Sequence, residues 1–180
     1  MKKDLNNSTL IILFVLSIPN IILCQKSISG AFGIELGAKF DTTSIIGKGS
    51  LTDGTPMYMF EPEKPFRSFS KYYVLITPKT NKVYGIWGIG EIDSDPMCTK
   101  EQDLLMAILN KKYGETDDQG LMSTIVDAKT ITIGERYITS KCSGYSDVTI
   151  DIRYYDENLK SIAEKERIEI ESEKLDSSGL

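Results

Sequence analysis

Several short segments of this chain alternate hydrophobic and polar residues with the two-residue period of a β-strand. The clearest is "DVTIDIRYY" at 147–155, which predicts a half-buried antiparallel strand with one wet face. "KYYVLIT" at 71–77 and "KVYGIWGIGEI" at 82–92 flank the turn sequence "PKTN", so this region predicts a β-hairpin. "MYMF" at 57–60 predicts a further short strand, and "TIVDAKTITIGERYITSKC" at 124–142 predicts one strand or two short ones.

The first half of the chain has weaker patterns. Apolar residues at alternate positions of 32–36 predict a strand. The segment 42–56, "TTSIIGKGSLTDGTP", is rich in glycine, serine and threonine and predicts a loop with at most a short helical turn. In the second strand of the hairpin, Val83, Trp87 and Ile89 are expected on one face, with the tryptophan in the core.

A helical pattern occupies residues 94–115, "SDPMCTKEQDLLMAILNKKYGE". Thr99 and Gln102 have the spacing of a capping box, in which two side chains satisfy two amides at the start of a helix. Gly114 is the expected stop signal. The apolar stripe predicted to face the core consists of Leu104, Leu105, Ile108 and Leu109.

The C-terminal sequence predicts a second, highly charged helix that begins at Asp156 as its N-cap. Leu159, Ile162 and Ala163 form a narrow apolar edge, so this helix is expected to dock by its first two turns and then run into solvent. The whole pattern predicts an α+β fold, an antiparallel sheet of about five to six strands with one central packed helix and a charged C-terminal helix.

The N-terminus has the order of a secretory signal peptide. A short basic start at 1–9 precedes an apolar segment at 10–24, which is shorter than the roughly 20 residues of an ordinary membrane span. The sequence therefore predicts cleavage after Cys24 or a few residues later. It places the α+β globular domain at 25–155 and the charged helix with a frayed tail at 156–180.

In two alternatives the protein stays attached to the membrane, either by an uncleaved N-terminal segment or by a lipid on Cys24. Bacterial lipoprotein signals resemble Leu-small-small-Cys, and the bulky Leu23 argues against lipidation. Both the cleaved and the lipidated form leave Cys98 and Cys142 as an even pair, which predicts one disulfide in an oxidising compartment. Two separate buried thiols are the alternative for this pair.

Composition narrows the possible functions. Hydrophobic content of 41% supports a real core, and charged content of 26% is that of an ordinary globular domain. The formal net charge is −5 without a dense Lys/Arg patch, which argues against a nucleic-acid partner and favours a basic protein partner. The chain has no histidine, which excludes Ser-His-Asp triads and the commonest zinc ligand sets.

Candidate chemistry is sparse. Glu91, Asp93 and Asp95 in "EIDSDP" are oxygen ligands of the kind that Ca²⁺ prefers, but the loop lacks further spaced oxygens and is ordinary turn composition. "GKGS" at 47–50 lacks the first glycine of a phosphate-binding loop and no apolar strand leads into it. No serine has a distinctive setting, so the sequence predicts no catalytic residue and no cofactor.

Adjacent tyrosines offer a softer signal. On a strand, neighbouring residues point to opposite faces, so Tyr73 or Tyr155 is exposed if its neighbour is buried. An exposed tyrosine on a sheet suits contact with a protein partner. Tyrosines that pack in the core with their polar tips in water are the alternative.

The chain resembles small exported α+β proteins of the bacterial cell envelope that have no assigned role. The resemblance rests on "FGIELG", "LLMAILNKKYG", "VTIDIRYYDENL" and the ending "LDSSGL". It implies an exported, periplasmic or envelope protein and transfers no catalytic or binding residue. The expected function is a non-catalytic binding module, inhibitor-like or immunity-like. The alternatives are a membrane-tethered structural or accessory protein, held only through its N-terminus, and a hydrolase without recognisable motifs.

Overall fold

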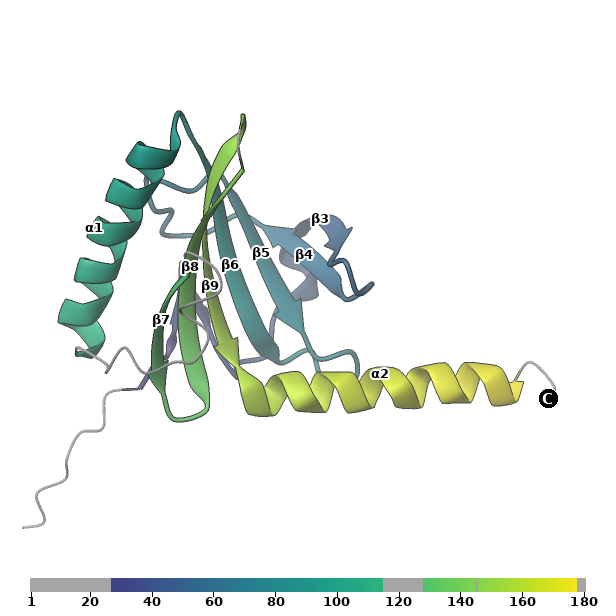
Figure 1. Cartoon of the computed structure of the whole chain (residues 1–180). Helices are drawn as coiled ribbons and strands as arrows, with labels where there is room; N and C mark the ends of the chain where they lie inside the picture. Colours follow the sequence, from purple (N-terminus) through teal and green to yellow (C-terminus); the bar gives the residue numbers. More distant parts are fainter. Residues whose placement is uncertain (1–26, 115–127, 145, 178–180) are drawn as a thin grey trace, which may run out of the picture.

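The computed structural model describes residues 27–114, 128–144 and 146–177 and has an α+β fold (Figure 1). Its main element is an antiparallel sheet with the strand order β3-β4-β5-β6-β9-β8-β7. The predicted class is confirmed, and the sheet has seven strands where about five to six were expected. The strands are β3 (Ile45–Ser50), β4 (Pro56–Phe60), β5 (Lys71–Ile76), β6 (Val83–Ile92), β7 (Ala128–Ile133), β8 (Arg136–Ser143) and β9 (Val148–Asp156).

The helix α1 (Asp95–Tyr113) covers one face of the sheet over β6, β8 and β9 (Figure 1). Alternate residues of β9 face it, and Val148, Ile150, Ile152 and Tyr154 are all buried in the main core, as the strict alternation predicts. These side chains remove apolar area from water at roughly 25 cal/mol per Å², which makes this face the main source of stability.

A two-stranded hairpin of β1 (Gly30–Ala31) and β2 (Ile34–Glu35) lies on the same core. The strand predicted at 32–36 is confirmed only for β2. Phe32 and Gly33 both have positive φ, 56° and 87°, and reverse the chain between the two short strands. The turn places the Phe32 ring edge-on to Tyr72, with the ring centroids 4.9 Å apart.

The loop predicted at 42–56 is also wrong in its middle, where β3 forms the edge of the sheet after a short 3₁₀ turn at Thr42–Ser44. An edge strand has one neighbour and needs few apolar side chains, so a glycine-rich strand escapes prediction from hydrophobic alternation. At 124–142 the described part forms two strands, β7 and β8, joined at Gly134 with φ 61°.

The predicted hairpin is confirmed as β5 and β6. The prediction that Val83 shares a face with Trp87 and Ile89 is wrong. The register shifts between Leu75 and Ile76, which turns Val83 to the α1 face, where it is 1% exposed. Trp87 and Ile89 lie on the opposite face.

The start of α1 differs from the capping-box prediction. The helix begins at Asp95, one residue before Pro96, because proline suits the first turn, where its missing N–H costs nothing. Thr99 therefore lies inside the helix and its hydroxyl donates to the Asp95 carbonyl, 3.1 Å. Gln102 is buried and its amide donates to the Ser140 carbonyl, 2.8 Å.

The buried side of α1 is rotated from the predicted stripe. Leu105 and Leu109 are buried as expected, but Leu104 and Ile108 are 43% and 46% exposed. Gly114 ends the helix as predicted, and its N–H donates to the Asn110 carbonyl. The buried residues of α1 are Cys98, Gln102, Leu105, Met106, Leu109 and Tyr113.

The helix α2 (Glu157–Ser177) lies across the strand ends on the other face (Figure 1). Its N-cap is Asp156 as predicted, because the carboxylate accepts from the Leu159 N–H at 3.0 Å. The expected two-turn docking is too short. Glu166 accepts from the Lys79 N–H at 2.7 Å, and the Lys79 ammonium lies 2.9 Å from the Glu169 carboxylate.

Candidate functional site

A single row of residues crosses the whole sheet on the face opposite α1. The ladder registers place Tyr73 between Met59 and Trp87, and Trp87 next to Arg153. Residues directly opposite each other on neighbouring strands share a face, so the row is continuous from one edge of the sheet to the other. We call it the transverse row, and it consists of Gly47, Met59, Tyr73, Trp87, Arg153, Thr139 and Thr130.

Trp87 and Arg153 form the centre of the transverse row. The guanidinium carbon of Arg153 lies 4.2 Å from the centroid of the indole ring, a cation–π contact. The Asp151 carboxylate holds this guanidinium with two hydrogen bonds, 2.8 Å from Nη2 and 3.2 Å from Nε. Since Asp151 is 7% exposed and Trp87 is 7% exposed, the three side chains form a pre-arranged unit.

The next row toward the strand ends is covered by α2. Leu75 and Tyr155 lie opposite Gly85 from its two sides, and Ala163 of α2 packs against this cluster. A Cβ on Gly85 would lie 2.9 Å from Leu75 Cδ1, so glycine makes the room that the two large side chains need. Burial raises the pKa of Tyr155 well above its usual range. The α2 helix therefore covers this row, and Trp87 of the transverse row belongs to the same buried cluster. Met59, Tyr73 and Arg153 of the transverse row are half-buried.

The two tyrosines predicted as partner contacts lie on this same face. Tyr72 and Tyr154 are buried on the α1 side, so Tyr73 and Tyr155 point to the other side, as alternation requires. Tyr73 is half-buried and in the transverse row. Tyr155 is 9% exposed and stacks on Tyr137, so its role is to support the sheet beneath α2.

A second row beside the transverse row carries most of the charge on this face. Lys71, Ile89, Asp151 and Lys141 lie side by side on β5, β6, β9 and β8. Lys71 pairs with Glu91 at 3.3 Å, and both side chains are exposed. We call the transverse row and this charged row together the open face. Although the chain is acidic overall, with a net charge of −5, its open face carries more basic than acidic residues.

The open face offers contacts for binding. Tryptophan, tyrosine, methionine and arginine are the residues enriched at the centres of protein interfaces, and the transverse row places all four types side by side. Strand alternation in the sequence points to Tyr73 but not to Met59 or Arg153, because their alignment with Trp87 depends on the pairing of separate strands.

The acidic residues weighed as a calcium site are not brought together. Glu91 pairs with Lys71, Asp93 is exposed in the connection, and Asp95 opens α1. Among the described residues, no group of three or more His, Cys, Asp or Glu side chains could hold a metal ion.

Two surface hollows are also present in the described part of the chain. One is lined by 39–42 and Asn81, and the other by 29–35 and Lys112. Each is lined mainly by a single loop, so neither gathers polar side chains from several strands as the open face does.

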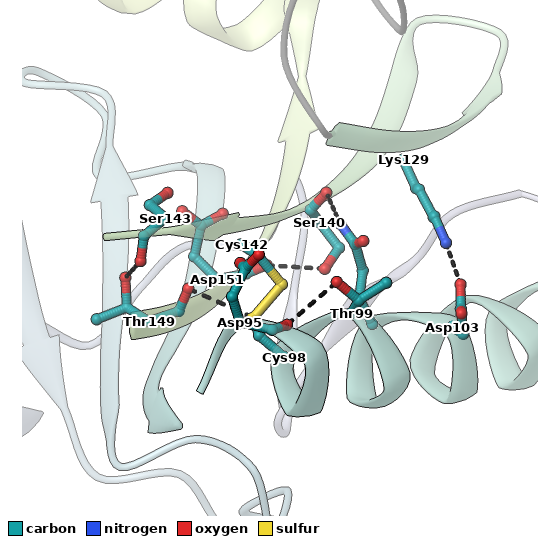
Figure 2. Close-up of a disulfide and its surroundings, with 11 residues drawn as sticks. Asp95, Cys98, Thr99, Asp103, Lys129, Ser140, Cys142, Ser143, Thr149 and Asp151 are labelled. Atoms are coloured by element: carbon teal, nitrogen blue, oxygen red, sulfur yellow. Dashed lines mark hydrogen bonds and ion pairs between the residues drawn. A yellow bond between two sulfur atoms is a disulfide. The ribbon is translucent and has the colours of Figure 1, made fainter. Parts of the chain in front are cut away.

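The predicted disulfide joins Cys98 at the start of α1 to Cys142 near the end of β8, with the sulfurs 2.05 Å apart (Figure 2). Around it, Gln102 binds the Ser140 carbonyl and Asp103 pairs with Lys129 of β7. These contacts fix the first half of α1 on β7 and β8. Cys24 and the predicted signal peptide lie outside the described residues.

Comparison with known proteins adds no relative. No protein-family model, no curated protein and no solved structure matches this chain. Among the described helices, none is long and apolar enough to cross a membrane.

Proposed function

We propose that this chain is an exported, non-catalytic binding module that docks a protein partner on its open face. The observation that carries the proposal is the row of half-buried side chains Met59, Tyr73 and Arg153. The buried Trp87 and Asp151 hold the guanidinium of Arg153 in place from below. Side chains that are already held in place lose little conformational entropy on binding, which favours affinity.

Export is part of the proposal and is supported by the cysteines. A disulfide between Cys98 and Cys142 persists in an oxidising compartment and is rare in a reducing cytosol. The basic and apolar N-terminal pattern, 1–24, supports the same periplasmic or envelope location. Mass spectrometry of the mature protein tests this step. We expect an N-terminus at Gln25, and a lipidated Cys24 would indicate a tethered protein instead.

The net charge of the chain suits a partner that is basic overall, and the open face suits an apolar contact segment of that partner. The net charge of −5 attracts a basic protein over long range. At the open face itself basic residues outnumber acidic ones, but Arg153 is paired with Asp151, and Lys71 with the neighbouring Glu91. Short-range contact is therefore made by Tyr73 and Met59. This arrangement suits an inhibitor-like or immunity-like protein that masks its partner.

Photo-crosslinking in intact cells tests the binding face. A benzoylphenylalanine at Tyr73 is expected to trap one protein partner, whereas the same probe at Ile168, which is 67% exposed on α2, serves as the matched control. Tyr73→Ala should abolish capture by the purified protein while leaving the fold intact. The absence of an adduct at Tyr73, or the same adducts at both positions, would show that the open face is not the binding surface.

A further inference from the structure

The two edges of the seven-stranded sheet are built differently. β3 forms one edge and β7 forms the other. An edge strand presents unpaired N–H and C=O groups to its surroundings, and proteins protect such edges against unwanted pairing with bulges, lysines, glycines or prolines. A difference in protection between two edges therefore indicates which edge is used for pairing.

The β3 edge carries these protective features. The register shifts between Ile45 and Gly47, so Ile46 bulges out of the ladder. Lys48 is exposed at the middle of the strand, and glycines at 47 and 49 flank it. A bulged, lysine-bearing, glycine-rich strand is a poor template for another strand.

The β7 edge has no bulge, no glycine and no proline. Its ladder with β8 runs from Ala128 to Ile133 without a register shift. Four consecutive residues, 130–133, are β-branched, the type that pairs best in sheets. The one charged residue, Lys129, is already paired with Asp103 of α1.

The hydrogen-bond pattern shows which backbone groups of β7 point outward. The Glu157 N–H donates to the Glu135 carbonyl, so these two residues are a hydrogen-bonded pair at the end of the β8–β9 ladder. Because hydrogen-bonded and non-hydrogen-bonded pairs alternate, odd-numbered residues of β8 bond to β9 and even-numbered ones bond to β7. Lys129, Ile131 and Ile133 bond to β8, so the backbone groups of Ala128, Thr130 and Thr132 face away from the sheet. Within the described residues, these three form no backbone hydrogen bond on the outer side.

We propose that β7 pairs antiparallel with β7 of a second copy of this chain, with Thr130 opposite Thr130 of the second copy. This register uses all three outward residues and gives about six interchain backbone hydrogen bonds. It places Lys129 opposite Ile131 of the second copy, whereas a register centred on Lys129 would set two lysines opposite each other. The strand is thus self-complementary in this register.

The dimer joins the two open faces. Thr130 is the last residue of the transverse row, so pairing at Thr130 continues that row across the two-fold axis into the second copy. The two sheets become one, with an Arg153 on each side of the junction. The dimer follows from the β7 edge alone and does not depend on the proposed function of the open face.

Analytical ultracentrifugation of the purified, disulfide-intact protein over a range of concentrations tests the dimer. We expect a concentration-dependent doubling of the mass. Thr130→Pro removes two interchain N–H donors without touching the β7–β8 ladder and should weaken association by about tenfold or more. Lys48→Pro, the matched change at the outward position of the other edge, should leave association unchanged.

Amide hydrogen exchange of the unaltered protein decides the question if Thr130→Pro does not fold. The Thr130 and Thr132 amides should become more protected as the concentration rises, and the Lys48 amide should not. A single monomer mass at every concentration would overturn the proposal. So would Thr130 protection that is independent of concentration, which would mean that the chain itself occupies the edge, or a dimer that only Lys48→Pro disrupts.

Discussion

The disulfide gives the sharpest test of how this fold is stabilised. Replacing Cys98 and Cys142 together with alanine removes a link between residues 44 positions apart. In the chain-entropy treatment, a crosslink over about 45 residues lowers the entropy of the unfolded chain and stabilises the fold by about 4 kcal/mol. Because a domain of this kind has roughly 5–15 kcal/mol of stability in total, the expected loss is a large fraction of it.

The location of the crosslink adds a second expectation. Cys98 is fully buried at the start of α1, and its neighbour Gln102 binds the Ser140 carbonyl of β8. Without the crosslink, α1 is held by its apolar side and by that amide, so the variant should still fold but unfold at lower urea concentration. Trp87 fluorescence and circular dichroism should report one coincident transition in both proteins.

Urea denaturation of the wild type and the double variant, each with and without reductant, measures the effect. Reductant should lower the unfolding midpoint of the wild type to that of the variant and leave the variant unchanged. A loss of free energy below about 1 kcal/mol would refute the crosslink argument. A variant that remains sensitive to reductant would show that another thiol reaction is responsible.

Three further predictions follow from single contacts. Gly90→Ala should destabilise the fold by more than about 3 kcal/mol, measured by urea denaturation, because its Cβ would lie 1.7 Å from the Ser68 carbonyl oxygen; near-wild-type stability would contradict this. Glu166→Ala leaves the Lys79 N–H without its acceptor and should cost about 1–3 kcal/mol, with faster exchange of that amide; unchanged exchange would show that α2 docks by other contacts. Burial raises the pKa of Tyr84 from 10.0 to about 12, so its stabilising contribution is complete below pH 10 and is lost as the pH rises to 12; ultraviolet titration showing a normal tyrosine would refute this.

The sequence predicted those parts of the fold that depend on local pattern. The alternation of β9, the β5–β6 hairpin, the Asp156 cap and the end of α1 at Gly114 all follow from residues a few positions apart. The disulfide is also predictable from the sequence. Once Cys24 is set aside, Cys98 and Cys142 are the two cysteines that remain, and an oxidising compartment favours their pairing.

The errors arise where local signals compete. The Thr99–Gln102 capping box has the right spacing, but Pro96 starts the helix earlier and moves both residues inside it. Val83 follows the strand period up to a bulge, which turns it to the other face. The hydrophobic pattern of one strand does not determine its register with the neighbouring strand.

The open face was partly predictable for the same reason. Tyr73 was identified because its neighbour is also a tyrosine and strand residues alternate. The contact between Arg153 and Trp87 joins residues 66 positions apart and is determined by the β6–β9 register. The sequence predicts Trp87 in the core, which its 7% exposure confirms, but only the structure shows the arginine stacked on it.

Because β6 pairs with β9, the sheet cannot be completed early in the synthesis of the chain. These two strands lie at the middle of the sheet, yet β9 is the last strand along the chain. The strands β3 to β6 pair with one another in sequence order, but one edge of β6 has no partner until β9 has been made. During synthesis the polypeptide therefore stays unfinished until nearly its whole length has emerged, and such a non-local closing step makes folding slow. Until β9 is in place, the unpaired edge of β6 is open to pairing with other chains, which favours aggregation.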